Sequence, residues 1–317
     1  MNLLNFIEQY PDESSCKAQF KVYRDRIGVL CSKCGSNKHY WKKDKEQYQC
    51  SSCGYRQSLR SNTVMHGSQL PFRYWFIAIH LLSSTRKGFS ALEIQRQLGH
   101  PYYEPIWAMV HKLRSVMGER DSIYQLKGTI ELDEGFFSVP VEEKDKDKPL
   151  KRGRGSQKKA KVLVMAESQP VEDKNEDKGK GKGKKNRKVG YLKMQVIDDL
   201  KAGSVQGVVS GEVDLEAEID SDDSTSYKGL EKMVAAHRPK VIPKQEIGKT
   251  LPWVHIAISN AKRLFLDIYH DINGRYLQNY LNEFCYKFNR RYFGENLFDR
   301  LLVAAVSYKN HFRYNIR

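Results

Sequence analysis

The sequence predicts an α/β protein whose main sheet follows a small cysteine-bearing module and a helical segment. Three observations support this fold class. Runs of β-forming residues occur at 129–139, 159–168 and 190–200, apolar residues recur at helical spacing from Pro252 almost to the end, and four cysteines form two close pairs near the N-terminus. The 317 residues, of which 40% are hydrophobic, suffice for about two domains with packed cores.

The order of these patterns predicts three regions, at 1–65, 66–125 and 126–317. The segments at 142–158 and 171–188 have few apolar residues and many Lys, Gly, Asp and Glu residues, so we expect them to be disordered insertions. Apolar spacing predicts helices over residues 1–25, 72–118, 229–237 and from 252 onward.

The net charge of +16 indicates a polyanionic partner, for which nucleic acid is the default expectation. Two segments have the opposite sign: 131–141 holds three acidic and no basic residues, and 189–254 holds 11 acidic and eight basic residues. The second segment concentrates its acids between Glu212 and Asp223, with no Lys or Arg between them. This run is either a solvated loop or a site for cations within a surface that holds phosphates.

Composition also excludes several classes of protein. The longest apolar runs are far shorter than the roughly 20 residues that a membrane span needs. The N-terminus lacks the basic and apolar regions of a secretory signal. Six cysteines are too few for a disulfide scaffold of this length, so we expect a protein of the reducing cytoplasm without a membrane partner.

The cysteine spacing C-x2-C-x15-C-x2-C predicts a zinc ribbon. The ligands of this Zn²⁺ ion would be Cys31, Cys34, Cys50 and Cys53. Gly35 and Gly54 follow the second cysteine of each pair, where a turn with positive φ is expected. Because all four ligands come from the protein, the zinc would be structural; the alternatives are two disulfides or a redox dithiol. Lys42 and Lys43 lie between aromatic residues, which suits either DNA contact or a merely solvated face.

A helix-turn-helix is predicted between residues 90 and 117. Ser90 is a candidate N-cap, Gly99 a stop signal, and a second helix would run from about Pro105 to Met117. Its exposed face would carry His111, Lys112 and Arg114. Its core would contain Leu92, Leu98, Ile106 and Val110. Plain helical packing without DNA binding is the alternative.

Acidic residues at strand positions suggest a cation site. In the strand at 129–139, Glu131 and Asp133 share one face, and Asp222 lies at the end of another probable strand. Two such aspartates could share Mg²⁺. His255 and Lys262 are seven residues apart, so they lie on one face of a helix that begins near Pro252. A packed helical histidine is the alternative for His255.

These segments together resemble the DDE-superfamily insertion-sequence transposases that have an N-terminal zinc ribbon. The resemblance covers most of the chain, and its last segment is the most distinctive. The matching segments are the ribbon cysteines, GTIELDEGFF with Asp133, SDDSTSYKGL with Asp222, WVHIAISNAKR, and IYHDINGRYLQNYLNEFCYKFNRR. The Lys-rich insertions depart from the family pattern, and Asp223 beside Asp222 leaves the choice of the second aspartate open.

In that family the third catalytic residue precedes a Lys or Arg by seven positions and is Glu, Asn or His, depending on the branch. The resemblance therefore implies that His255 is the third metal ligand, as in a DDH branch, and that Lys262 contacts DNA. Imidazole in place of a carboxylate changes the charge of the ligand set from −3 to −2. Activity should then fall below about pH 6.5, where imidazole becomes protonated, and Mn²⁺ should be better tolerated.

The resemblance implies an RNase H-like catalytic core for residues 126–317: a mixed sheet flanked by helices. Two Mg²⁺ or Mn²⁺ ions would act there, with Asp133 bridging them, Asp222 binding one and His255 the other. Water would first cleave the element end, and the exposed 3′-hydroxyl would then attack target DNA. The basic residues expected to contact DNA are Lys42, Lys43, Lys112, Arg114, Lys262, Arg263, Arg290 and Arg291.

The partners implied are double-stranded element ends and target DNA, near the nucleoid of a bacterial cell. A homo-oligomer is expected because two ends must be paired. Two other classes stay open. An RNase H-like nuclease or resolvase would cleave without joining, and a zinc-ribbon and helix-turn-helix regulator would bind DNA but would not need Asp133 or Asp222.

Overall fold

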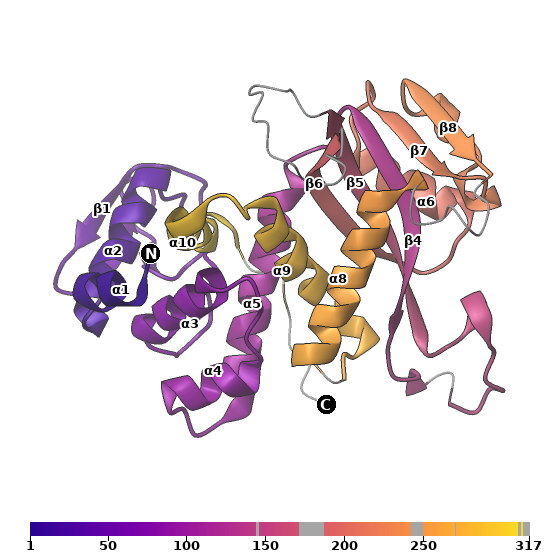
Figure 1. Ribbon diagram of the computed structural model, residues 1–317. Helices are drawn as coiled ribbons and strands as arrows, with labels where there is room; N and C mark the ends of the chain where they lie inside the picture. The colour runs from indigo at the N-terminus through magenta and orange to yellow at the C-terminus, as the bar shows by residue number, and fades with distance from the viewer. Residues whose placement is uncertain (144–145, 171–186, 242–249, 270, 310–311, 313–317) are drawn as a thin grey trace, which may run out of the picture. The chain divides into compact units, whose positions relative to one another are not determined.

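The computed structural model describes residues 1–143, 146–170, 187–241, 250–269, 271–309 and 312 (Figure 1). The chain forms two compact units, one of residues 1–121 with 290–317 and the other of residues 122–289. Most of the predicted insertion at 171–188 lies outside the described residues. In the other insertion the described residues are mostly exposed and include a 3₁₀-helix, η2, at Gly153–Gly155.

The second unit is built on a five-stranded mixed sheet of order β6-β5-β4-β7-β8. The strands are β4 at Thr129–Ser138, β5 at Lys159–Pro170, β6 at Arg187–Ile197, β7 at Glu218–Asp222 and β8 at Ala236–Lys240. The first three pair antiparallel as a meander, whereas β7 pairs parallel to β4 and β8 pairs parallel to β7. This is the RNase H-like strand order, so the expected α/β class is confirmed.

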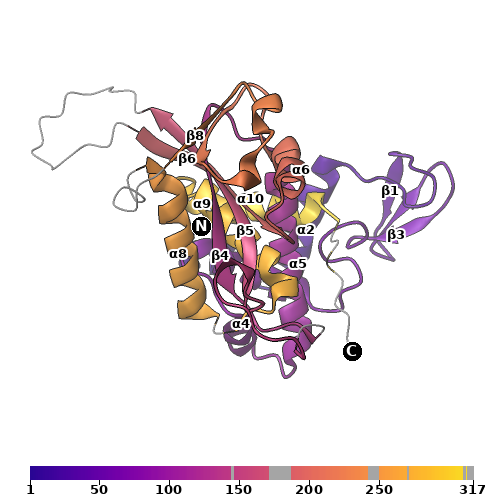
Figure 2. The same ribbon diagram turned by 90° about the vertical axis from the view of Figure 1, so that its right-hand side faces the viewer.

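Helices cover both faces of this sheet, as Figures 1 and 2 show. On one face, apolar residues of α8 and α9 pack against Phe137, Val164 and Met194 of the strands. On the other face, α6 packs against Ile130 and Leu163. The bounds are α6 at Ala202–Glu212, α8 at Pro252–Ile268 and α9 at Leu277–Asn289, with 3₁₀-helices η3 at Thr225–Tyr227, η4 at Leu230–Lys232 and η5 at Gly274–Tyr276. The alternation of β4 decides which of its side chains face each layer.

The first unit joins a small antiparallel sheet to a group of helices. The sheet has the order β1-β2-β3, with bounds His39–Lys42, Gln47–Cys50 and Arg56–Ser58. The helices are α1 at Leu3–Gln9, α2 at Glu13–Ile27, α3 at Phe72–Ser84, α4 at Ala91–Leu98, α5 at Tyr103–Ser122 and α10 at Leu297–Ser307, with η6 at Gly294–Asn296. Aromatic contacts hold them: Phe298 of α10 lies against Phe6, Tyr10 and Phe76.

The predicted helix-turn-helix segment forms two helices, but the prediction of which of its residues are buried and which are exposed is wrong in part. Ser90 caps α4 by accepting a hydrogen bond from the backbone nitrogen of Glu93 at 3.1 Å, and Gly99 ends it with a φ of 61°. Leu92, expected in the core, is 45% exposed, because Ile94 takes the buried position of this helix. His111 and Arg114, expected to be exposed, are both buried.

Two other expectations about the second unit differ from the structure. Residues 229–237 were expected to be helical, yet they form the 3₁₀-helix η4 and the start of strand β8. Their apolar residues Leu230 and Val234 do enter the core, but parallel pairing with β7 makes Ala236–Lys240 a strand. Helix α6 was not expected, because its three glycines weaken the helical pattern; Val205 and Val209, which pack under the sheet, stabilise it.

Candidate active site

Asp133 and Asp222 lie side by side on adjacent parallel strands. Leu132 of β4 pairs with Ser221 of β7, so the next residue of each strand, Asp133 and Asp222, are neighbours at the end of β7. A carboxylate oxygen of each, together with one of Glu134, forms a group whose atoms all lie within 4.8 Å of one another. Asp223 is exposed and is not part of this group.

Glu134 was not singled out by the sequence. It follows Asp133 directly, so alternation places it on the other face of β4, where Tyr227 is buried. It still reaches the aspartates because the described pairing of β7 with β4 ends at Leu132. Only the end of the short strand β7 could have indicated that Glu134 reaches the aspartates, and the sequence does not reveal how β7 is aligned with β4.

Asp133 lies in an environment that disfavours its charged form. Burial and the charge of Asp222 raise the pKa of Asp133 to about 6. The backbone N–H of Glu134 and the positive charges of Arg154 and Lys262 oppose this rise. The Glu134 nitrogen donates a hydrogen bond of 2.8 Å to Asp133 Oδ1. Among the described residues, no Lys or Arg forms an ion pair with Asp133, Glu134 or Asp222.

Much of the acidic run between Glu212 and Asp223 is neutralised by basic side chains, contrary to a uniformly solvated loop. Arg238 of β8 pairs with Glu218 at 2.6 Å and with Asp220 at 2.9 Å. Glu212 pairs with Lys193, and Asp214 lies 3.6 Å from Lys127. Asp222 differs from these acids, because its Oδ1 atom is buried and has no hydrogen-bond partner within the described part of the chain.

Helix α8 brings a third group to the aspartates. Pro252 occupies its first turn, and the N-cap residue Leu251 has no side-chain capping hydrogen bond. The buried carboxylate of Glu131, two residues before Asp133 on the same strand, accepts hydrogen bonds from the backbone nitrogens of Trp253 at 2.7 Å and Val254 at 3.3 Å. This places His255 so that its Nδ1 atom lies 3.5 Å from Asp133 Oδ2.

Lys262 lies two turns further along α8. Its ammonium nitrogen is 5.8 Å from the centre of the Phe137 ring. Burial and Lys159 lower the pKa of Lys262, while the charge of Asp133 opposes this shift. The lysine therefore presents a partly desolvated positive charge at the same face of the sheet as Asp133 and His255.

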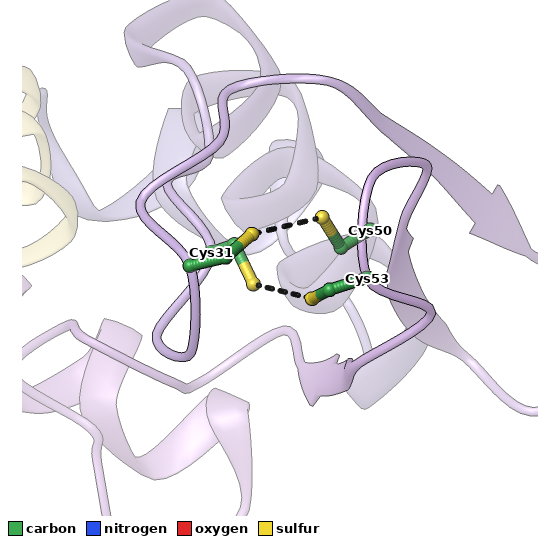
Figure 3. Close-up of side chains that lie close together, drawn as sticks. Cys31, Cys50 and Cys53 are labelled. Atoms are coloured by element: carbon green, nitrogen blue, oxygen red, sulfur yellow. Dashed lines mark hydrogen bonds between the residues drawn. The ribbon is translucent and has the colours of Figure 1, made fainter.

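The four cysteines of the first unit form a second cluster, with all sulfur atoms within 4.8 Å of one another. The sulfur atoms of Cys31 and Cys53, and those of Cys34 and Cys50, are 3.6 Å apart. Figure 3 shows the sulfur atoms of Cys31, Cys50 and Cys53 turned toward one another from facing turns. Tetrahedral ligands at about 2.3 Å from Zn²⁺ would lie about 3.8 Å apart, whereas a disulfide needs about 2 Å. The donor set and its spacing fit zinc.

Backbone N–H groups prepare two of these cysteines for a metal. Burial opposes the thiolate form, yet the N–H groups of Cys53 and Ser52 lower the pKa of Cys50 to about 6. The N–H groups of Cys34 and Lys33 similarly lower the pKa of Cys31. Thiolate is the form that binds Zn²⁺.

The basic residues expected to contact DNA divide by exposure. Arg114 and Arg290 are buried, and Arg290 forms an ion pair of 2.6 Å with Asp121. Lys112 is half-buried and donates to the backbone oxygen of His66 at 3.1 Å. The remaining expected residues are exposed or half-buried: Lys42, Lys43, Lys262, Arg263 and Arg291.

The RNase H-like sheet, with carboxylates on the two adjacent strands β4 and β7, defines the class of fold in which the site lies. Residues 125–289 match the family model of the ISXO2-like transposase domain, which covers just over half of the chain. The chain belongs to this family of transposases. A comparison with curated proteins finds no match. No helix in the described part of the chain is both long and apolar enough to cross a membrane.

Proposed function

We propose that the protein is the transposase of a bacterial insertion sequence, which binds the element ends, cleaves them and joins the 3′-hydroxyl ends to target DNA. The observation that supports this most strongly is the convergence of Asp133, Asp222 and His255 from two adjacent strands and a helix. They gather within the segment that matches the transposase family.

The residues of this site fit divalent cations. Adjacent ligands of an octahedral Mg²⁺ lie about 3 Å apart, and the 3.5 Å between His255 Nδ1 and Asp133 Oδ2 is slightly longer. The buried Oδ1 atom of Asp222, without a protein partner among the described residues, is suited to a cation. When bound, Mg²⁺ or Mn²⁺ ions would supply Lewis-acid activation of the attacking oxygen and stabilise the leaving oxygen.

The side chains of the chain have separate roles in this proposal. Asp133 is central, because it lies next to both Asp222 and His255, and would hold both cations. Asp222, rather than the exposed Asp223, is the second ligand. Neutral His255 is the third, with Glu131 fixing the start of its helix. Lys262 would bind a DNA phosphate close to the carboxylates.

We further propose that the cysteine cluster holds a structural Zn²⁺ ion and that the ribbon with Lys42 and Lys43 binds duplex DNA. Lys112, Arg263 and Arg291 extend the set of phosphate contacts, whereas the buried Arg114 and Arg290 are omitted from it. Two ends must be joined in one reaction, so the active form would be a homo-oligomer on DNA, acting at the bacterial nucleoid.

The test uses the full chain, duplexes with the flanking ends of its element, Mg²⁺ and a supercoiled plasmid. The proposal predicts end cleavage followed by covalent joining of the 3′ ends to the plasmid. Cleaved ends without joined product would favour the nuclease or resolvase alternative. Binding without any cleavage would favour the regulator.

A further inference from the structure

Glu134 is a buried acid with an unsatisfied oxygen. Its side chain is 7% exposed, and its Oε1 atom is buried without a hydrogen-bond partner among the described residues. An unpaired carboxylate in such a place is costly, so buried acids are normally paired with a base or bound to a metal. Among the described residues, no Lys or Arg forms an ion pair with Glu134. The nearby acids Glu218 and Asp220, in contrast, pair with Arg238 and Lys240 of β8.

The end of β7 explains why this carboxylate can join two aspartates from the opposite face. On one edge, β4 pairs with β5 along its whole length to Ser138. On the other edge, its described pairing with β7 ends at Leu132. Beyond that point, side chains from both faces of β4 can bend around the open edge. One oxygen of Glu134 therefore lies within 4.8 Å of those of Asp133 and Asp222.

The surroundings of Glu134 concentrate negative charge. Burial and the charges of Asp133 and Asp222 raise its pKa, whereas the hydroxyl of Tyr227 and the positive charge of Arg154 oppose this rise. Tyr227, buried on the same face, has its pKa raised by burial and by the same three carboxylates. Three acids that gather without an ion pair to a Lys or Arg among the described residues are stabilised if a divalent cation neutralises them.

We propose that Glu134 is a further ligand of the cation site that Asp133, Asp222 and His255 form. This rests on the proposed function. It also accounts for the charge of the site: the imidazole of His255 leaves the ligand set at −2, and Glu134 returns it to −3. The site would then take hard divalent cations such as Mg²⁺ with three carboxylates and one imidazole.

The test measures Mn²⁺ binding to the full chain without DNA, from the loss of the free Mn²⁺ signal in electron paramagnetic resonance. Three variants are compared with the wild type: Glu134→Gln, Asp133→Asn, and Asp223→Asn as the control acid outside the cluster. We expect Glu134→Gln to weaken Mn²⁺ binding at the site by about tenfold or more. Asp133→Asn should abolish it, and Asp223→Asn should leave it unchanged.

The outcomes separate this inference from the proposed function. Wild-type affinity in Glu134→Gln, with binding lost in Asp133→Asn, overturns the role of Glu134 and leaves the proposed function intact. Equal affinity in Asp133→Asn, or no binding by the wild type, contradicts the cation site itself, and the role of Glu134 with it.

Unfolding by heat in the presence of a chelator controls for misfolding. Glu134→Gln should be at least as stable as the wild type, because the change removes a buried charge. The rise in melting temperature that Mn²⁺ gives the wild type should be smaller in this variant. If Glu134→Gln does not fold, Glu134→Asp decides: its carboxylate is one methylene shorter, so weaker Mn²⁺ binding supports the inference and unchanged binding contradicts it.

Discussion

The carboxylate of Glu131 accepts a hydrogen bond of 2.7 Å from the backbone nitrogen of Trp253, which joins strand β4 to the first turn of α8. Asp133 follows Glu131 on the same face of the strand, and His255 follows Trp253 in the same helix. A single buried acid thus fixes the distance between two of the proposed metal ligands. It also supplies the N-terminal cap that α8 does not find in its own sequence.

Loss of this cap should destabilise the second unit. We expect Glu131→Ala to lower the free energy of unfolding by about 1–3 kcal/mol, because two buried N–H groups lose their acceptor. Urea unfolding followed by circular dichroism measures this. The matched control is Glu216→Ala, an exposed acid in the same unit. Equal midpoints for both variants would contradict the capping role.

Removal of zinc should unfold the ribbon. The purified chain should contain about one Zn²⁺ ion, and Cys34→Ser should lose most of it. Cys285→Ser is the control, because Cys285 lies in the second unit, outside the cluster. Atomic absorption gives the metal content, and a chelator should lower the melting temperature of the wild type. A purified chain that contains no Zn²⁺ and whose melting temperature does not change with the chelator would refute the zinc site.

Acid should destabilise the first unit through His111. Burial, with a smaller contribution from Arg114, lowers the pKa of His111 to about 2. The unfolded chain binds a proton there below about pH 6.5, and the folded chain does not. Stability from this group is therefore complete above that pH and is lost as the pH falls, by up to about 1.4 kcal/mol per pH unit.

The variant His111→Gln should take up about one proton fewer on unfolding than the wild type, so its free energy of unfolding should depend less steeply on pH. The measurement compares unfolding midpoints at neutral and mildly acidic pH. His66→Gln is the control, since His66 is exposed. An identical pH slope for the wild type and His111→Gln would show that His111 is not the group responsible.

His255 should matter for chemistry rather than for DNA binding. We expect His255→Ala to slow end cleavage by more than about 100-fold, because even the mutation of a residue that only hydrogen-bonds a metal ligand lowers metal affinity or activity by about 10–100-fold. Gel-shift affinity for the element ends should stay within a factor of about two. Ser259→Ala, an exposed change on the same helix, should cleave normally. A cleavage rate near that of the wild type would remove His255 from the ligand set.

The fold was predictable from sequence where local pattern and tertiary pairing agree. The strand around Asp133 and the helix that begins at Pro252 both occur as expected. The segment with Leu230 and Val234 was misjudged, since its apolar spacing suits a helix, while pairing with β7 makes Ala236–Lys240 an edge strand. Pro239 is tolerated there because an edge strand has an unpaired side.

The candidate site was predictable only in part. Strand positions suggested Asp133 and Asp222 as a cation site, and the family resemblance added His255. The structure places Asp222 beside Asp133 through strand register, which no local pattern reveals. Glu134 was missed because alternation assigns it to the opposite face. The burial of Arg114 was missed because an arginine on an amphipathic helix is normally exposed, and only packing shows otherwise.

The most direct test of the account compares Asp133→Asn with Asp223→Asn in the cleavage reaction on element-end duplexes with Mg²⁺. We expect Asp133→Asn to bind the ends with wild-type affinity but to make no cut, and Asp223→Asn to cut and join normally. Cleavage by Asp133→Asn at the wild-type rate would contradict the assignment of this acidic cluster as the catalytic centre.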